Sequence, residues 1–555
     1  MKKQTPLIDI HPDHWEIVSE ILKEHVPQYE VWAFGSRATW NAKEFSDLDL
    51  AVISDTPLPL SIIASLSEAF SESDLPWKVD MVDWASTSES FREIIERDKV
   101  VVLKEDGLGI KELRQTADGV NTMRLSDLVD FNPDRLLEKG ISAPFIEMAD
   151  LTVDNRDVTQ IGMRVFRGGG SKFANGDTLF ARITPCLENG KTAKVIGLLD
   201  KSVGHGSTEF IVMSAKDKKH DEEFVYYLAR SPGFRSFAKS QMAGTSGRQR
   251  VSWQALSNYE TYCIDKTARK KIGDILASLD NLIAANRSIS ACLEAMARAM
   301  FKAWFVDFEP VRAKLEGRWQ RGQSLPGLPA HLYDLFPDRL VESELGEIPE
   351  GWGVVGFTDI VEIIGGGTPK TSIDEYWNGN IPWFSVVDTP RSSDVFVVQT
   401  EKSITQAGLN GSSAQLIDKG TTIISARGTV GNLALAGCQM AFNQSCYALR
   451  GKNGTGNYFV FLSTQRIVER LREMAHGSVF STITRQTFET VRTVLPPANL
   501  LQQFERSAAS WLDVVLINVN KSQTLSKLRD TLLPKLISGE LRVTESKQII
   551  EDASQ

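Results

Sequence analysis

The sequence has few cysteines and no long apolar run. Its 555 residues include five cysteines, none of them in a CxxC pair, whereas disulfide frameworks and zinc knuckles need paired or clustered cysteines. No stretch approaches eighteen uninterrupted apolar residues, and the first residues carry charge and proline where a signal peptide has an apolar core. We therefore expect a cytoplasmic protein without a structural disulfide, a zinc site or a membrane contact.

An overall excess of positive charge is also missing, since the net charge is -9. Residues 1–109 hold 10 Lys and Arg against 21 Asp and Glu, which leaves 52 against 50 for the remainder. The acidity is confined to one end, so a basic groove can exist on the near-neutral remainder. Charge therefore does not exclude nucleic-acid binding, and the length predicts several domains.

The N-terminal segment alternates predicted helices and strands around a Gly-Ser turn. Gly35, Ser36 and Arg37 follow the apolar run 31–34. A glycine lets the backbone approach a phosphate, and neighbouring N–H groups with an arginine can hold it. The turn is a candidate nucleotide-binding site.

Three carboxylates follow this turn. Asp47 and Asp49 lie two residues apart on a predicted strand and so share one face, and Asp80 offers a third oxygen ligand from another strand. Carboxylates are ligands that Mg²⁺ prefers. A single aspartate at a strand end is more simply a solvated residue, but the three together predict a metal-binding and catalytic set for phosphoryl transfer.

The strings "FGSRATWNAKEFSDLDLAV" and "VDMVD" resemble the minimal nucleotidyltransferase family. The resemblance implies that Gly35 and Ser36 cradle a nucleoside triphosphate while the three aspartates hold Mg²⁺. The family usually has a second glycine where this chain has Trp40. Three interpretations stay open: an active nucleotidyltransferase, a degenerate docking module, and an acidic domain that mimics DNA charge or regulates assembly.

The rest of the chain contains an internal repeat with a constant spacing of 232 residues. The repeated positions include a run typical of a coiled coil, with Asn286 in the first helix and Asn518 in the second. The predicted a positions of the first helix are Ile272, Leu279, Asn286, Leu293 and Met300, and its predicted d positions are Ile275, Leu282, Ile289 and Met296. We expect an antiparallel pair whose register the two asparagines set, unless either asparagine is exposed to solvent.

The strings "SELGEIPEGW", "GGTPKTSIDEYWNGNIPWFSVVD" and "LLPKLISGELRV" resemble the specificity subunit of type I restriction-modification enzymes. The resemblance implies two target-recognition domains, each reading one half of an asymmetric bipartite site in double-stranded DNA. It also implies spacer helices that dock two methyltransferase subunits and, through them, restriction subunits. S-adenosylmethionine and ATP are expected on those partners only.

The predicted fold class is α+β multidomain, with a nucleotidyltransferase-like α/β domain and two α/β target-recognition domains separated by two long antiparallel coiled-coil helices. The predicted parts are the nucleotidyltransferase-like domain (1–109), target-recognition domain 1 (110–265), spacer helix 1 (266–308), a linker without a core of its own (309–344), target-recognition domain 2 (345–498), spacer helix 2 (499–540) and a C-terminal tail (541–555).

DNA contacts need basic or amide side chains on loops. The predicted DNA-binding residues are Lys172, Arg182, Arg248 and Arg250 in the first domain and Lys370, Arg427, Arg485 and Gln486 in the second. Arg182 and Arg427 are expected at matching places of the repeat. For any one of these residues alone, an exposed side chain that contacts only water is the simpler interpretation.

The sequence as a whole predicts a DNA-specificity subunit that neither cuts nor methylates alone. The alternative function is a nucleotidyltransferase that the C-terminal region delivers to DNA or to a partner.

Overall fold

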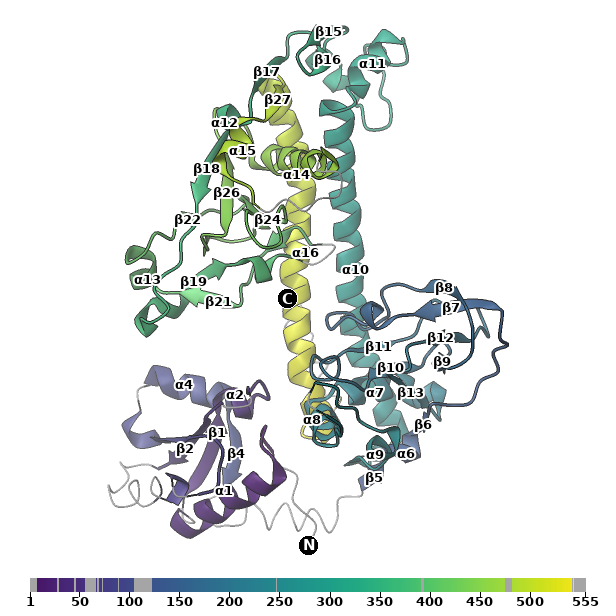
Figure 1. The fold of residues 1–555 in the computed structure, drawn as a ribbon, viewed down its shortest axis with the longest axis vertical. Coiled ribbons are helices and arrows are strands. Elements are labelled where there is room, and N and C mark those ends of the chain that lie inside the picture. The colour runs from purple at the N-terminus through teal and green to yellow at the C-terminus, as the bar shows by residue number, and fades with distance from the viewer. Residues whose placement is uncertain are drawn as a thin grey trace. The chain divides into compact units, whose positions relative to one another are not determined.

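The fold is taken from a computed structural model (Figure 1). It describes residues 7–26, 29–43, 46–54, 66, 69–71, 73–87, 89–103, 122–245, 247–390, 394–474, 482–541 and 543. Contacts divide the chain into two compact units, one of residues 1–278 with 528–555 and the other of residues 279–527. The predicted boundary at residue 109 and nearly all of the predicted tail lie outside the described residues.

The N-terminal part is a mixed four-stranded sheet in the order β3-β2-β1-β4. Alternating apolar residues form its strands, which are β1 (Glu30–Phe34), β2 (Leu48–Ile53), β3 (Val79–Asp83) and β4 (Val100–Leu103). Its helices are α1 (Pro12–His25), α2 (Gly35–Ala38) and α4 (Glu89–Asp98). The apolar face of α1 packs into the core of this sheet through Trp15, Val18 and Leu22, as its helical spacing of apolar residues predicts.

The first globular domain of the repeat begins with a short strand and ends with its partner strand, β5 (Thr122–Arg124) and β14 (Glu260–Tyr262). Two four-stranded sheets lie between, in the orders β11-β10-β13-β6 and β8-β7-β12-β9. Their strands are β6 (Val129–Phe131), β7 (Ser142–Ile146), β8 (Gly162–Val165), β9 (Ser171–Phe173), β10 (Thr178–Ala181), β11 (Thr192–Lys194), β12 (Gly204–Gly206) and β13 (Phe210–Ala215). The helices are α6 (Leu125–Leu128), α7 (Lys218–Arg230), α8 (Pro232–Ser240) and α9 (Trp253–Ser257).

The second globular domain repeats this plan. It is likewise closed by a strand pair, β17 (Gly353–Gly356) with β27 (Arg492–Leu495), and its sheets run β18-β26-β23-β24-β20 and β21-β19-β25-β22. Their strands are β18 (Val361–Gly365), β19 (Trp377–Phe384), β20 (Phe396–Val397), β21 (Lys402–Ile404), β22 (Leu416–Ile417), β23 (Thr422–Ser425), β24 (Leu433–Ala436), β25 (Met440–Phe442) and β26 (Cys446–Gly451). The helices are α12 (Phe357–Ile360), α13 (Gln406–Asn410), α14 (Asn457–Met474) and α15 (Arg485–Glu489).

A long helix follows each domain, α10 (Lys266–Phe305) after the first and α16 (Ala498–Ser538) after the second. The 232-residue spacing also holds at the start of each domain, because the N–H of Leu125 donates to the Tyr259 carbonyl (2.8 Å) and that of Phe357 to the Val491 carbonyl (2.9 Å). The repeat therefore covers whole domains.

The segment expected to be a linker (309–344) packs against the second domain. It contains α11 (Glu309–Leu315) and β15 (Leu340–Ser343), which forms a hairpin with β16 (Gly346–Pro349) at the start of the next segment. Val311, Trp319 and Leu332 are buried in the cluster that includes the aromatic residues at the end of α10. Scattered prolines and glycines in this segment do not prevent its apolar residues from joining a neighbouring core.

Candidate functional site

The register of the N-terminal sheet brings the Gly-Ser turn and two of the predicted carboxylates together. Asp49 on β2 lies opposite Phe34 on one side and opposite Asp80 on the other. Gly35 has φ +73°, and a Cβ there would lie 2.5 Å from Oδ2 of Asp49. Only glycine fits this left-handed position beside the carboxylate. Asp47 is exposed just before β2.

The three carboxylates influence one another electrostatically. Burial raises the pKa of Asp49, and the charges of Asp80 and Asp47 raise it further. Lys78 forms an ion pair with Asp80, with Nζ 2.5 Å from Oδ1. Within the described residues, no group of three or more His, Cys, Asp or Glu is arranged to hold a metal ion. The carboxylate oxygens of the three aspartates are the hard ligands that a Mg²⁺ site uses. One of the three, Asp80, is paired with Lys78.

Arg37, predicted as a nucleotide-binding residue, is held by backbone carbonyls of its own domain. Its buried guanidinium donates to the carbonyls of Ser46 (2.6 and 2.9 Å) and Asp9 (2.7 Å) and stacks over the Trp77 ring at 4.3 Å. These contacts tie the N-terminal segment and the loop before β2 to α2. Arg37 is therefore a structural clamp beneath the turn.

Trp40 has a φ of +58°. This is the left-handed region, which glycine adopts without strain and a bulky residue seldom adopts. The backbone thus keeps the conformation that suits the family's glycine, although this chain places an indole there.

In the first domain, two predicted DNA-binding residues contact Glu209, a residue that the sequence did not single out. Arg250 donates from Nε and Nη2 to both carboxylate oxygens of Glu209 at 2.7 to 3.0 Å, and the N–H of Arg182 donates to the Glu209 backbone carbonyl (3.0 Å). Glu209 directly precedes β13 in a Ser-Thr-Glu-Phe string that resembles many others, so no residue pattern pointed to it.

Lys172, predicted as a DNA contact, makes a hydrogen bond within its own domain. Its Nζ donates to the Arg135 carbonyl (2.7 Å), and Arg135 in turn pairs with the buried Asp177 (2.8 Å). The amine thus helps to hold the segment before β7 against β9.

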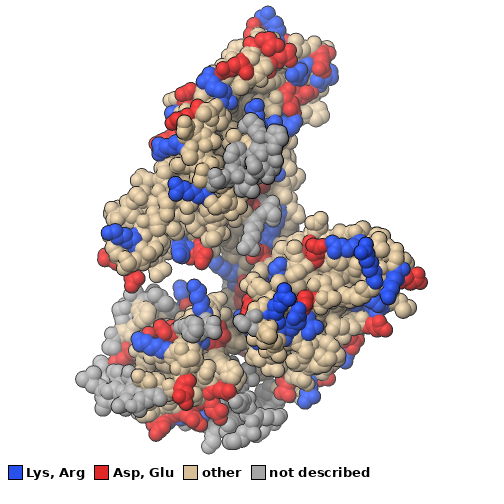
Figure 2. All heavy atoms as spheres, viewed as in Figure 1, with Lys and Arg blue, Asp and Glu red and all other residues tan. Residues whose placement is uncertain are grey.

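The other predicted DNA-binding side chains are free at the surface. Within the described residues they make no hydrogen bond or ion pair, and all are exposed: Arg248, Lys370, Arg427, Arg485 and Gln486. Figure 2 shows blue and red side chains interspersed among tan ones on the face in view. Arg248, Lys370 and Arg427 therefore stand on loops, and Arg485 and Gln486 at the start of α15.

Arg182 and Arg427 do not occupy matching positions, contrary to the prediction. The N–H of Val251 donates to the Arg182 carbonyl (3.0 Å), whereas the repeated Ile483 donates to the Ala426 carbonyl (2.9 Å). The structure therefore matches Arg182 with Ala426, and Arg427 lies one residue further on.

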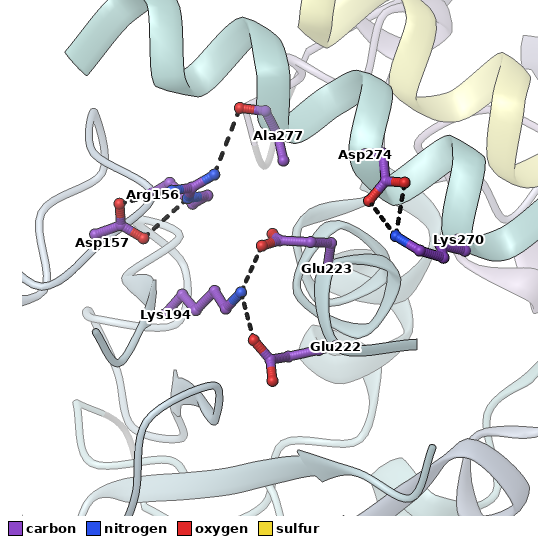
Figure 3. Close-up of polar contacts among 8 residues, drawn as sticks. All are labelled: Arg156, Asp157, Lys194, Glu222, Glu223, Lys270, Asp274 and Ala277. Atoms are coloured by element: carbon purple, nitrogen blue, oxygen red, sulfur yellow. Dashed lines mark hydrogen bonds and ion pairs between the residues drawn. The ribbon is translucent and has the colours of Figure 1, made fainter. Parts of the chain in front are cut away.

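Buried charges join the first domain to its helix (Figure 3). Lys194 at the end of β11 pairs with Glu222 (2.7 Å) and Glu223 (2.5 Å) on α7, while Arg156 pairs with the neighbouring Asp157 and reaches the Ala277 carbonyl of α10 at 3.5 Å. Direct docking of the domain on α10 follows from this contact and from the buried Arg269–Asp221 ion pair (2.7 Å).

The two predicted register residues lie in reciprocal pairs. Nδ2 of Asn286 is 3.5 Å from Oγ of Ser522, and Nδ2 of Asn518 is 3.4 Å from Oγ of Ser290. Since 286 faces 522 and 290 faces 518, the helices run antiparallel in this part. Asn518 is buried and Asn286 is half-buried.

The d positions of the first helix were predicted one residue too early. Leu282, Ile289 and Met296 are 53%, 49% and 43% exposed, while the next residues, Ile283, Ser290 and Ala297, are buried. The same holds in α16, where Val514 is exposed and Val515 is buried. The exposed positions of α10 form a second stripe with coiled-coil spacing, which we call the outer stripe: Leu282, Ala285, Ile289, Cys292, Met296 and Ala299.

Among the described residues, no helix combines the length and the apolar character needed to span a bilayer.

Comparisons with known proteins agree with both halves of this architecture. Residues 349–508 match the family model "Type I restriction modification DNA specificity domain", and residues 16–107 match "Polymerase beta, Nucleotidyltransferase". The HindI specificity subunit of Haemophilus influenzae is 27% identical over 403 residues, which cover 66% of this chain and 86% of that protein. The chain carries a type I restriction-modification DNA specificity domain.

The specificity family does not account for the N-terminal domain of this subunit. Over 99 residues, 18% of the chain, it is 54% identical to a probable protein adenylyltransferase, MntA, of Haemophilus influenzae, and the match covers 87% of that protein. The domain is therefore a member of the nucleotidyltransferase family. A crystallised S subunit from M. genitalium aligns with 76% of this chain and 97% of its own, with 14% identity and a TM-score of 0.46.

Proposed function

We propose that this specificity subunit binds an asymmetric bipartite site in double-stranded DNA, with one half-site read by each globular domain. The repeat is the observation that carries the proposal, because two domains of one plan have different loops and each leads directly into a long helix. A helix of 40 residues is about 60 Å long at 1.5 Å per residue. That length is comparable to one or two turns of DNA.

The test is selection of DNA from a random library by the full chain assembled with its methyltransferase subunits. The proposal expects a motif of two short half-sites separated by an unspecified spacer. A continuous motif, or none from an assembled complex, would contradict it.

The outer stripe of α10 is proposed to dock a helix of a methyltransferase subunit. Two methyltransferase subunits would bind this chain and recruit the restriction subunits. Exposed apolar residues at alternating three- and four-residue steps are what a partner helix packs against. Ile289→Glu places a charge in the stripe and is expected to weaken methyltransferase binding at least tenfold. Arg287→Glu, beside the stripe, is the control, and equal binding by both variants would contradict the proposal. S-adenosylmethionine and the ATP used by the restriction subunits belong to these partners.

For the N-terminal domain we propose nucleotidyl transfer from a nucleoside triphosphate, with ATP as the first to test because the relative is named a probable adenylyltransferase. Gly35 and Ser36 would hold the phosphates, and Asp47, Asp49 and Asp80 the Mg²⁺. The metal would neutralise phosphate charge during transfer. Asp80 becomes available when Lys78 leaves it, and this exposed pair is weak.

This proposal is tested by incubating the full complex with labelled ATP and Mg²⁺. The double variant Asp47→Ala with Asp49→Ala should lose label transfer to protein, whereas Asp74→Ala, an exposed control, should retain it. If the wild-type chain neither transfers label nor binds ATP, the domain is a docking module.

A further inference from the structure

Three charged residues of the first domain form a unit at the end of β10, which we call the Arg182 triad: Arg182, Glu209 and Arg250. They come from three separate segments and are joined through the backbone. The N–H of Arg182 donates to the Glu209 carbonyl (3.0 Å), and the N–H of Val251, next to Arg250, donates to the Arg182 carbonyl (3.0 Å). The strand ends therefore fix where the three side chains begin.

The side chains of the triad leave hydrogen-bonding capacity for a ligand. Glu209 occupies Nε and Nη2 of Arg250, whose side chain is 42% exposed. Nε of Arg182 has no hydrogen-bond partner within the described residues, but it is buried, so the free donors that a ligand can reach are those of Arg250. The hydrogen bond from Arg250 lowers the pKa of Glu209, with smaller contributions from the charges of Arg250 and Arg182. The Glu209 carboxylate thus holds the guanidinium of Arg250, and the triad keeps one net positive charge.

The second domain has the same backbone frame without the charges. The N–H of Ala426 donates to the Ser445 carbonyl (2.8 Å), and that of Ile483 donates to the Ala426 carbonyl (2.9 Å). Ala426, Ser445 and Thr482 therefore stand where the first domain has Arg182, Glu209 and Arg250. Since the frame forms with small neutral residues, the fold does not require the triad, and all three members have changed together.

We propose that the Arg182 triad reads guanine in the half-site bound by the first domain, with Arg250 as the reading residue and Glu209 as the residue that positions it. This rests on the proposed function of DNA recognition. A guanidinium binds O6 and N7 of guanine through two N–H groups, and Nη1 with the second Nη2 proton of Arg250 provides such a pair. A phosphate contact serves any sequence equally, so it gives no reason for the two domains to differ at all three positions.

The test uses the full chain assembled with methyltransferase subunits and DNA selected from a random library. Glu209→Gln and Arg250→Lys should each reduce the preference for at least one G·C pair of one half-site by roughly 5- to 150-fold. The other half-site should stay unchanged, which also shows that the complex is folded. The matched control is Glu362→Gln, which removes the charge from an exposed ion pair in the second domain, where Nε and Nη2 of Arg450 donate to one oxygen of Glu362 (3.0 and 2.7 Å). This variant should alter neither half-site.

A double variant separates base reading from a structural tie. Glu209→Arg with Arg250→Glu restores an ion pair and should not restore the lost base preference, so recovery of that preference would overturn the proposal. Unchanged preferences in both single variants would also overturn it, as would equal weakening on all sequences with a smaller salt dependence, the mark of a phosphate contact. A wild-type complex without a two-part motif counts against the proposed function itself.

Discussion

Glu294 on α10 makes the stability of the second unit depend on pH. Its side chain is 5% exposed, and within the described residues its Oε1 has no hydrogen-bond partner. Oε2 lies 3.7 Å from Nη1 of Arg298. Burial raises the pKa of Glu294 to about 7, with Arg298 acting in the opposite direction and Asp394 adding to the rise. The carboxyl is therefore protonated in the folded chain at pH values where it ionises in the unfolded chain.

The sign follows from the raised folded-state pKa. The stabilising contribution is complete below the ordinary value of 4.5 and is lost as the pH rises through about 7. The difference between these two pKa values corresponds to about 3 kcal/mol of unfolding free energy. Glu294→Gln keeps the neutral shape at every pH, so the variant should match the wild type near pH 4 and be more stable by about this amount at pH 8.

Hydrogen exchange of peptides from α10 measures this difference, with variant and wild type compared at the same pH. At pH 8 the variant should exchange more slowly by on the order of 100-fold, and at pH 4 the two should coincide. Glu469→Gln, at a side chain that is 50% exposed, should have no effect at either pH. A stability difference for Glu294→Gln that does not change between pH 4 and pH 8 would refute the reasoning.

Arg37→Ala should destabilise the N-terminal sheet by about 2 to 4 kcal/mol, because it leaves the carbonyls of Ser46 and Asp9 without their donor. Hydrogen exchange of β1 and β2 measures this loss, and unchanged exchange would contradict the role of Arg37 as a clamp. Arg269→Ala should lower the free energy of unfolding by about 3 to 5 kcal/mol, because it leaves the buried Asp221 without its ion-pair partner. The loss should appear as faster hydrogen exchange in α7, and unchanged exchange would mean that the pair is dispensable. Replacing Asn286 and Asn518 together by Leu should retain the helix pair but loosen its register, measured by cysteine cross-linking across the pair; a single cross-linking register would contradict this role.

The sequence predicted the repeat and the two long helices because apolar spacing of this kind survives divergence elsewhere in the domains. It could not choose the d positions, because Leu282 and Ile283 are adjacent and both apolar. One of them faces α16 and the other belongs to the outer stripe. Periodicity alone does not distinguish the apolar face that packs against α16 from an apolar face that is exposed to solvent.

The candidate sites were predicted less completely than the fold. The register of β2 joins Gly35, Asp49 and Asp80 as their order along the chain suggested. The bonds of Arg37 and Lys172 go to backbone carbonyls of segments distant in sequence, and carbonyls leave no signal in the residue types. Glu209 was missed because its role depends on a side-chain pair with Arg250, which lies 41 residues later in the chain.

The central claim is that the chain gives a methyltransferase its DNA specificity, and a genome-wide map of methylated sites tests it most directly. The full chain is expressed with its methyltransferase subunits in cells that lack both, beside the Asp47→Ala and Asp49→Ala double variant. The account predicts one asymmetric two-part motif, identical for both chains. A methyltransferase that modifies the same sites with and without this chain would contradict it.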